Sequence, residues 1–217
     1  MSIARDHAPT ESAKPTRRRL SVQARRLELL EIGADLLGTR PYEELGIEQV
    51  AEAARISNGL LYHYFGNKRE FFLAVVANEA NKLLEATRPH PELPATQRFL
   101  ASLDGYLEYV DTHRRGYRAL YLGALGAEGA VRAIMTRNQT TQRDRILSVL
   151  SPDQAAPAPL RLAVQGWIAF LIAVCLDWLD DPSITREELR DQCVRTLRGV
   201  IAAADTKEAR DTRDNGQ

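Results

Sequence analysis

Apolar residues recur every three to four positions along most of the chain, from Ser21 to Ala204. This period places them on one face of an α-helix, and the strict alternation typical of strands is nearly absent. The pattern therefore predicts an all-α protein. The expected helices cover residues 22–40, 47–54, 58–65, 68–87, 95–112, 114–124, 128–150, 160–180 and 185–204.

Local signals set several of these boundaries. Ser21 and Ser57 stand where helix N-caps are expected, because a serine hydroxyl can accept a hydrogen bond from the first turn. Thr185 and Glu188 form a T-x-x-E capping box that predicts the start of the last helix. Three prolines in RPHPELP (88–94) end the fourth helix, since proline cannot continue one.

The helices group into an N-terminal head and a larger C-terminal domain. Residues 1–16 are rich in Ser, Thr, Ala and Pro, so we expect a disordered basic arm there. We expect a three-helix head at 17–67, a larger helical domain at 68–204 and a flexible, charged tail at 205–217.

The formal net charge of zero hides an uneven distribution of charge along the chain. Residues 1–26 carry seven basic and two acidic side chains, whereas residues 27–56 carry two basic and seven acidic ones. The hydrophobic content of 44% and charged content of 27% are ordinary for a soluble globular protein. Total charge therefore indicates no partner, but the N-terminal arm is basic.

The cysteines and the most apolar segment point to ordinary packing. Cys175 and Cys193 lie in apolar helical patterns without metal-ligand spacing, so we expect buried thiols, no metal site and no cofactor. Residues 162–176 are too short a run to span a membrane, for which about 20 apolar residues are needed. No apolar stretch follows the basic N-terminus, so we expect a cytoplasmic protein with no membrane partner.

Two short helices separated by a three- to four-residue turn match the helix-turn-helix motif, whose second helix lies in the DNA major groove. This second helix reads NGLLYHYF, residues 58–65. Leu61 and Phe65 are four positions apart and are expected to pack inward. The outward face then carries the phosphate donors Tyr62 and His63, and Lys68 follows at the start of the next helix.

The stretch LLYHYFGNKREFF, with IEQVAEAARIS before it, resembles the tetracycline-repressor (TetR) family of bacterial regulators over residues 17–76. The resemblance implies that Tyr62, His63 and Lys68 bind phosphates while residues 58–60 approach base edges. The candidate DNA-binding residues, the basic arm included, are Arg17, Arg18, Arg19, Gln49, Ser57, Asn58, Gly59, Leu60, Tyr62, His63 and Lys68.

Some of these assignments have alternatives. Tyrosines at helical spacing, such as Tyr62 and Tyr64, are usually core residues, and Tyr64 fits either packing or a backbone contact. The triplet Arg17–Arg19 fits a solvated tail or an arm that enters the minor groove. The sequence departs from the family pattern at Gly46, where a Ser or Thr cap is usual, and at Arg55, where the turn usually has Gly.

The resemblance also implies a larger domain that binds a small ligand and pairs two subunits. Residues 160–179 are apolar nearly all round and need cover on both sides, which independently favours a homodimer. The candidate interface residues are Trp178, Leu189, Cys193, Leu197, Val200 and Ile201. For each candidate ligand-binding residue taken alone, ordinary core packing is favoured over ligand binding. The candidates are Tyr106, Tyr109, Tyr117, Tyr121, Met135, Gln139, Gln165 and Trp167.

The sequence thus predicts a dimeric, ligand-responsive transcriptional repressor that binds a pseudo-palindromic DNA operator. Segments 113–121 and 178–184 faintly resemble regulators of this family that sense acyl-CoA, so the expected effector is apolar or acyl-like. The alternatives are a helical protein-interaction module and a helical enzyme. An enzyme is disfavoured because no nucleophile–base pair, metal spacing or phosphate loop is present in the sequence.

Overall fold

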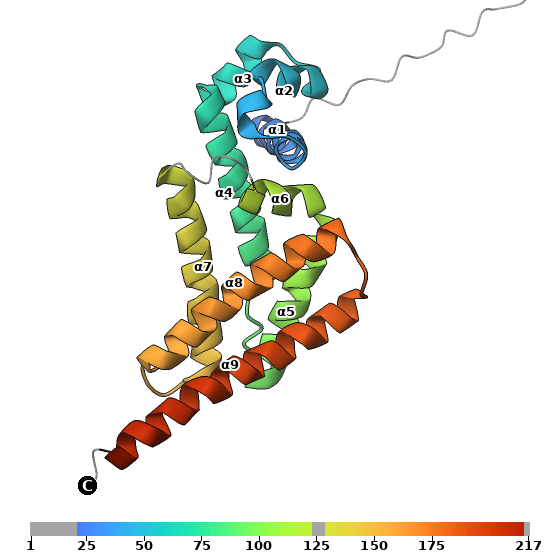
Figure 1. The fold of residues 1–217 in the computed structure, drawn as a ribbon. Coiled ribbons are helices and arrows are strands. Elements are labelled where there is room, and N and C mark those ends of the chain that lie inside the picture. The colour runs from blue at the N-terminus through green and yellow to red at the C-terminus, as the bar shows by residue number, and fades with distance from the viewer. Residues whose placement is uncertain (1–20, 123–128, 215–217) are drawn as a thin grey trace, which may run out of the picture.

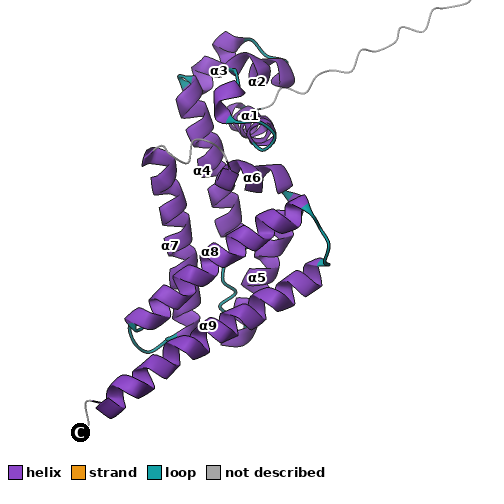
Figure 2. Cartoon of the chain, viewed as in Figure 1, coloured by secondary structure: helices purple, strands orange, loops and turns teal. Residues whose placement is uncertain are grey.

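The computed structural model describes residues 21–122 and 129–214, and every regular element in these ranges is helical (Figures 1 and 2). The predicted all-α class is therefore confirmed. The arm predicted at residues 1–16 and the triplet Arg17, Arg18 and Arg19 lie outside the described residues. The elements are α1 (Val22–Leu37), the 3-10 turn η1 (Tyr42–Glu44), α2 (Ile47–Ala54), α3 (Asn58–Phe65), α4 (Lys68–Ala86), α5 (Ala95–Thr112), α6 (Arg114–Leu122), α7 (Gly129–Leu150), α8 (Ala158–Asp180) and α9 (Arg186–Asp214).

Most helix starts lie where the capping residues predict them. The Ser21 hydroxyl accepts a hydrogen bond from the Ala24 N–H at 3.1 Å, and the Ser57 hydroxyl accepts one from the Leu60 N–H at 3.2 Å. The predicted capping box at the start of α9 also forms, because the Glu188 carboxylate accepts hydrogen bonds from the backbone N–H and the hydroxyl of Thr185. These bonds satisfy donors that the first turn of a helix leaves without partners.

The head consists of α1, α2 and α3, and it packs on the N-terminal part of α4 (Figure 1). Its core is formed by fully buried side chains from all four helices. These include Leu29, Leu30, Val50, Leu61, Phe71 and Phe72. The rings of Phe65 and Phe71 meet edge to face with centroids 4.9 Å apart, which fixes α3 against α4.

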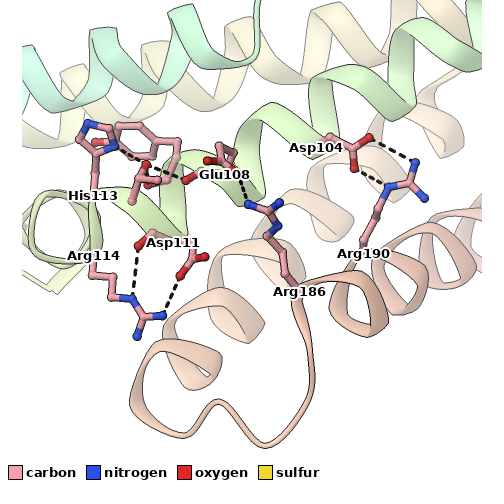
Figure 3. Close-up of polar contacts among 9 residues, drawn as sticks. Asp104, Glu108, Asp111, His113, Arg114, Arg186 and Arg190 are labelled. Carbon is pink, nitrogen blue, oxygen red and sulfur yellow. Dashed lines mark hydrogen bonds and ion pairs between the residues drawn. The ribbon is translucent and has the colours of Figure 1, made fainter.

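The larger domain consists of the rest of α4 together with α5 to α9. Helices α8 and α9 lie side by side and run in opposite directions, with α5 and α7 on their inner side (Figure 1). Two arginines near the start of α9 form ion pairs with α5, Arg186 with Glu108 and Arg190 with Asp104 (Figure 3). Helix α4 contacts α1 and α3 of the head as well as α5 and α7, so it belongs to both parts of the molecule.

A polar cluster joins α1 of the head to the larger domain. Its members are Glu31, Glu79, Lys82 and Tyr109, and we call them the Glu79 cluster. The Lys82 ammonium lies 2.6 Å from the Glu31 carboxylate and 2.8 Å from that of Glu79, and the Tyr109 hydroxyl donates to Glu79 at 2.7 Å. Glu79 is only 1% exposed, so its charge is retained in the interior by these partners.

Two features of the structure differ from the prediction. Helix α9 continues through Asp214, ten residues beyond its predicted end, so most of the tail expected from Asp205 is helical. No glycine or proline lies between Val200 and Asn215, and nothing in that part of the sequence therefore ends the helix earlier. The 3-10 turn η1 was not predicted, because three residues are too few to show a period.

Four of the six residues predicted for the dimer interface have their cover within one protomer. Trp178, Leu189, Cys193 and Leu197 are buried inside the protomer, where α8 and α9 cover each other. A helical period identifies an apolar face, but it does not say whether the cover comes from the same chain or from another. Val200 and Ile201 are partly buried and remain candidates.

Candidate nucleic-acid interface and ligand pocket

The turn between α2 and α3 has the geometry of a tight helix-turn-helix connection. Arg55 ends α2 in the left-handed conformation, with φ 55° and ψ 47°, and Ser57 already caps α3. The Ile56 N–H donates to the Ala51 carbonyl at 2.9 Å, which closes the end of α2. Arginine thus adopts the backbone conformation that glycine adopts most easily, at a cost in strain of about 1 kcal/mol.

Helix α3 divides into a buried and an exposed face, as predicted. Leu61 and Phe65 are buried in the head core. The side chains on the other face are exposed, and they are Ser57, Asn58, Leu60, Tyr62 and His63, with Gly59 between them. Leu60 is 39% and Tyr62 42% exposed, so neither is a core residue. Large apolar and aromatic groups that remain on a surface mark a contact site.

Tyr64, which the sequence left unassigned, packs. It is partly buried against the core, and its ring lies 6.2 Å from that of Phe65 and edge-on to that of His63 at 6.0 Å. Its position explains why four residues with rings, Tyr62 to Phe65, can follow one another on one short helix. Tyr62 and His63 face solvent, while Tyr64 lies at the border of the core.

Lys68 and Gln49 have roles within the head that the sequence did not reveal. The Lys68 ammonium lies 4.4 Å from the centre of the Tyr42 ring, a cation–π contact that holds it beside the C-terminal end of α3. The Gln49 side-chain oxygen accepts a hydrogen bond from the Gly46 N–H at 3.3 Å. This bond caps α2 where Gly46 offers no hydroxyl, so Gln49 positions the helix-turn-helix motif.

A pocket in the larger domain lies between the end of α4 and helices α5, α7 and α8. It contains about 590 Å³ of space free of atoms, the open mouth included. Of the eight predicted ligand residues, it brings together Tyr106 and Trp167. The lining residues are Thr87, Pro89, Arg98, Phe99, Ser102, Leu103, Tyr106, Gln142, Arg145, Ile146, Ser148, Val149, Trp167 and Leu171.

The other predicted ligand residues do not line this pocket. Tyr109 donates to Glu79, and the Tyr117 hydroxyl lies 2.8 Å from that of Tyr106, with the Tyr117 ring against that of Tyr121. Met135, Gln139 and Gln165 are partly buried outside it. Burial raises the pKa of Tyr106, Tyr109, Tyr117 and Tyr121, so these hydroxyls remain neutral hydrogen-bonding groups of the core.

No pattern in the sequence pointed to the two arginines of the pocket. Arg98 is the only arginine of α5, and Arg145 is one of four arginines in α7, with no motif that distinguishes it from the others. The Arg145 guanidinium donates to the carbonyl oxygens of Leu84 and Thr87 at 2.8 and 3.1 Å. The pKa of Arg145 is lowered, mainly by burial.

Helix α8 also has an outward apolar face in the protomer. Leu162 is 74% exposed, and Gly166, Ala169 and Ala173 follow it on the same side of the helix. A Cβ atom added at Gly166 would have no neighbour within 4 Å. By length and composition α8 could cross a membrane, a test that core helices of soluble proteins also pass.

The described residues contain no group of three His, Cys, Asp or Glu side chains that could hold a metal ion. Cys175 and Cys193 are buried free thiols, and burial raises the pKa of Cys193 to about 11. A thiol with so high a pKa is protonated at neutral pH and is a poor nucleophile.

Comparison with known proteins gives two matching family models. The model of bacterial regulatory proteins of the tetR family matches residues 29–75, and the model of the tetracyclin repressor-like C-terminal domain matches residues 95–199. The two matches cover the head and most of the larger domain, in the order in which they follow each other here.

Individual relatives agree with these matches. A tetR-family transcriptional regulator from Streptomyces coelicolor is 30% identical, with a TM-score of 0.76 over 87% of this chain and 85% of its own. The transcriptional activator FasR of Mycolicibacterium smegmatis is 24% identical over 166 residues, 75% of this chain and 76% of its own. The fatty acid degradation regulator FadR of Bacillus halodurans shares the fold at 12% identity, with a TM-score of 0.69 over 83% of this chain and 96% of its own.

Proposed function

Because the chain belongs to the TetR family of bacterial transcriptional regulators, we propose that it is a repressor that binds a pseudo-palindromic DNA operator as a homodimer and is released by a small apolar or acyl-like effector. Members of this family regulate transcription by binding DNA and are not enzymes. The proposal places the protein in the cytoplasm, where its operator is.

The exposed face of α3 carries the proposal for DNA. Tyr62 and His63 offer donors to phosphates, and the N-terminal residues Asn58 to Leu60 stand where a recognition helix meets base edges. The cation–π contact with Tyr42 holds the Lys68 ammonium near the end of α3, which supports a further phosphate contact. Polar and apolar groups are thus combined on one surface, as the reading of base pairs and thymine methyl groups requires.

The outward face of α8 supports the homodimer. Leu162, Gly166, Ala169 and Ala173 form a stripe of one large and three small residues, and small residues let two helices approach closely. A two-fold axis would pair this stripe with itself, together with Val200 and Ile201 of α9. Two heads related by the same axis would meet successive major grooves.

The pocket of the larger domain supports the effector. Its interior is mostly apolar, with a few polar groups, as is usual for sites that bind small molecules. Helix α4 connects it to the head, since Thr87 at its end contributes to the pocket while its first turns pack on α3. An effector that favours another position of α4 would change the separation of the two heads.

A mobility-shift titration with DNA from upstream of the protein's own gene, repeated at rising salt concentration, tests the DNA proposal. We expect specific binding and a steep fall in affinity with salt, because Lys and Arg contacts to phosphates release counterions. Binding that is equal for unrelated DNA would instead leave a helical interaction module as the better description. A reporter gene behind the same DNA then distinguishes repression from the activation that FasR's name describes.

Three variants separate the roles of the α3 face. Tyr62→Phe removes a neutral donor, so affinity should fall about tenfold or more per half-site with an unchanged salt slope. Lys68→Ala should reduce the slope of log affinity against log salt concentration by about 2, because the dimer would lose one phosphate contact from each protomer. Asn58→Ala should relax the preference at particular bases. Glu48→Gln, on exposed α2 surface, is the control, and unchanged DNA binding in all three test variants would overturn the site assignment.

Light scattering after gel filtration tests the dimer. Leu162→Glu places a charge in the proposed interface and should yield monomers, whereas Val22→Glu changes an equally exposed apolar residue of the head and should not. A monomeric parent protein at micromolar concentration, or a dimeric Leu162→Glu variant, would contradict this interface.

A further inference from the structure

The pocket of the larger domain combines an apolar interior with two guanidinium groups. Phe99, Leu103, Trp167 and Leu171 supply apolar walls from α5 and α8. Arg98 and Arg145 lie in the same lining, on α5 and α7. Arg145 caps the C-terminal carbonyls of α4, but neither arginine forms an ion pair with a described residue. The question is what balances their charge.

Arg98 has a donor without an acceptor. Its Nε atom is buried and has no hydrogen-bond partner within the described ranges, and one terminal nitrogen donates to the Leu93 carbonyl at 3.2 Å. A buried N–H that lacks a partner is costly, and the cost is greater for a charged group. Such a group in a pocket lining is explained when a bound molecule supplies the missing acceptor.

Arg145 has hydrogen bonds but no counter-charge. Its guanidinium donates only to neutral oxygens, the carbonyls of Leu84 and Thr87 and the Thr87 hydroxyl, and it forms no ion pair with any described residue. Glu85 acts on Arg145 without contacting it, and it is already paired with Arg88. Glu92 acts in the same way on Arg98, and its carboxylate contacts the His90 ring.

The lining of the pocket restricts what kind of anion fits. A guanidinium presents its donors in a plane that matches the two oxygens of a carboxylate. The apolar walls would bind a hydrocarbon chain attached to that carboxylate, since each buried methylene group contributes about 0.8 kcal/mol. An inorganic anion would leave these walls uncovered, and an alcohol would leave both arginines without a counter-charge.

We propose that this pocket binds an apolar carboxylic acid as its anion, with the carboxylate at Arg98 and Arg145 and the hydrocarbon chain against Phe99, Leu103, Trp167 and Leu171. The inference rests on the proposed function, because it names the chemistry of the effector in that scheme. Arg98 donates from Nε, and Arg145 provides the second positive charge at the head of the site.

Decanoate, decanol and decylamine share one chain and differ only in the head group, so they test the proposal directly. In the Trp178→Phe variant Trp167 is the only tryptophan left of two, and its fluorescence reports on the pocket. We expect decanoate to change this fluorescence with at least tenfold higher affinity than decanol, and decylamine to have no effect. Calorimetry on the unmodified protein checks the affinities.

Arginine variants link the preference to the two side chains. Arg98→Gln should lower the affinity for decanoate at least tenfold and leave the affinity for decanol unchanged. Arg98→Lys should retain part of the preference for decanoate over decanol, because lysine retains the positive charge. Arg143→Gln, on α7 but outside the pocket and paired with Asp144, is the matched control. Circular dichroism verifies that each variant is folded.

Several results would overturn the proposal. They are equal binding of decanoate and decanol, an unchanged preference in Arg98→Gln, or no binding of any probe by the folded protein. Decanoyl-CoA is tested as a further probe. If this thioester binds and decanoate does not, the proposal that the ligand is a free carboxylate is also rejected. Operator binding is measured separately, so a protein that binds DNA but not decanoate refutes only this inference. A protein that binds decanoate but no DNA refutes only the proposed function.

Discussion

Replacing Lys82 by methionine removes the cation that stands between two carboxylates, Glu31 of α1 and Glu79 of α4. The Glu79 carboxylate, 1% exposed, would then retain only the Tyr109 hydroxyl and the Asn78 amide as donors, at 2.7 and 3.3 Å. Removing one partner of a buried ion pair costs about 3–5 kcal/mol, because the remaining charge is left without compensation. The two remaining donors place Lys82→Met near the lower end, at about 3 kcal/mol.

Substitutions of the two glutamates should each lower the free energy of unfolding by less than Lys82→Met does, Glu31→Gln by the least. In Glu79→Gln the Lys82 ammonium keeps Glu31 at 2.6 Å and is itself 26% exposed, so we expect a loss of about 1–2 kcal/mol from the weaker bond to Tyr109. Glu31→Gln should cost less than about 1 kcal/mol, since the Glu31 side chain is 52% exposed. The double variant Glu79→Gln/Lys82→Met has no buried carboxylate without a cation beside it, so it should be more stable than Lys82→Met alone.

Urea unfolding followed by circular dichroism, at one protein concentration for all variants, measures these differences. A fixed concentration is needed because a dimer's stability depends on it. The reasoning would be refuted if Lys82→Met cost less than Glu79→Gln, or if the double variant were the least stable. Either result would mean that the Glu79 carboxylate is not held as a charged group by Lys82.

Three further predictions concern glycines and buried tyrosines. Gly38→Ala should destabilise the protein by about 1–3 kcal/mol in urea unfolding, because its Cβ would lie 2.2 Å from a backbone oxygen of α6; Gly199→Ala, with no neighbour within 4 Å, is the control. Gly59→Ala should stabilise α3 by up to about 1 kcal/mol yet weaken operator binding in a mobility shift, since its Cβ has open space in the protomer but would face the bases. Stability should hold up to about pH 10 and fall above it. Burial raises the pKa of Tyr106 and Tyr117, so the unfolded chain releases their protons first. Loss of helical signal should therefore accompany tyrosinate absorbance, and early titration of these tyrosines in a fully helical protein would contradict the packing.

The sequence predicted features that depend on neighbours a few positions away. Ser57 and Thr185 cap helices because their partners lie three residues further on, and Leu61 and Phe65 share a face because they are four apart. The period of the apolar residues was enough for the whole series of helices. The motif around Tyr62 added the orientation of α3 and, with it, the candidate DNA surface.

Features that depend on distant parts of the chain could not be predicted. The contact between Lys82 and Glu31 joins residues 51 positions apart, and Arg98 and Arg145 line one pocket only after α5 and α7 have packed. The same limit explains the interface prediction, because the apolar stripe through Leu189, Cys193 and Leu197 is covered by α8 of the same protomer. A period gives the direction of a side chain but not the identity of what covers it.

Helix α4 is a single span of 19 residues without glycine or proline, and it extends from the end of α3 to the edge of the pocket. At 1.5 Å per residue it is about 28 Å long. If it pivots near its C-terminal end as a stiff rod, a rotation of about 5° displaces its other end by about 2.5 Å, and the two heads of a dimer would together gain or lose about 5 Å of spacing. That is more than the rise between adjacent base pairs, about 3.4 Å. A change in the pocket too small to alter any helix could therefore move the heads out of register with the grooves.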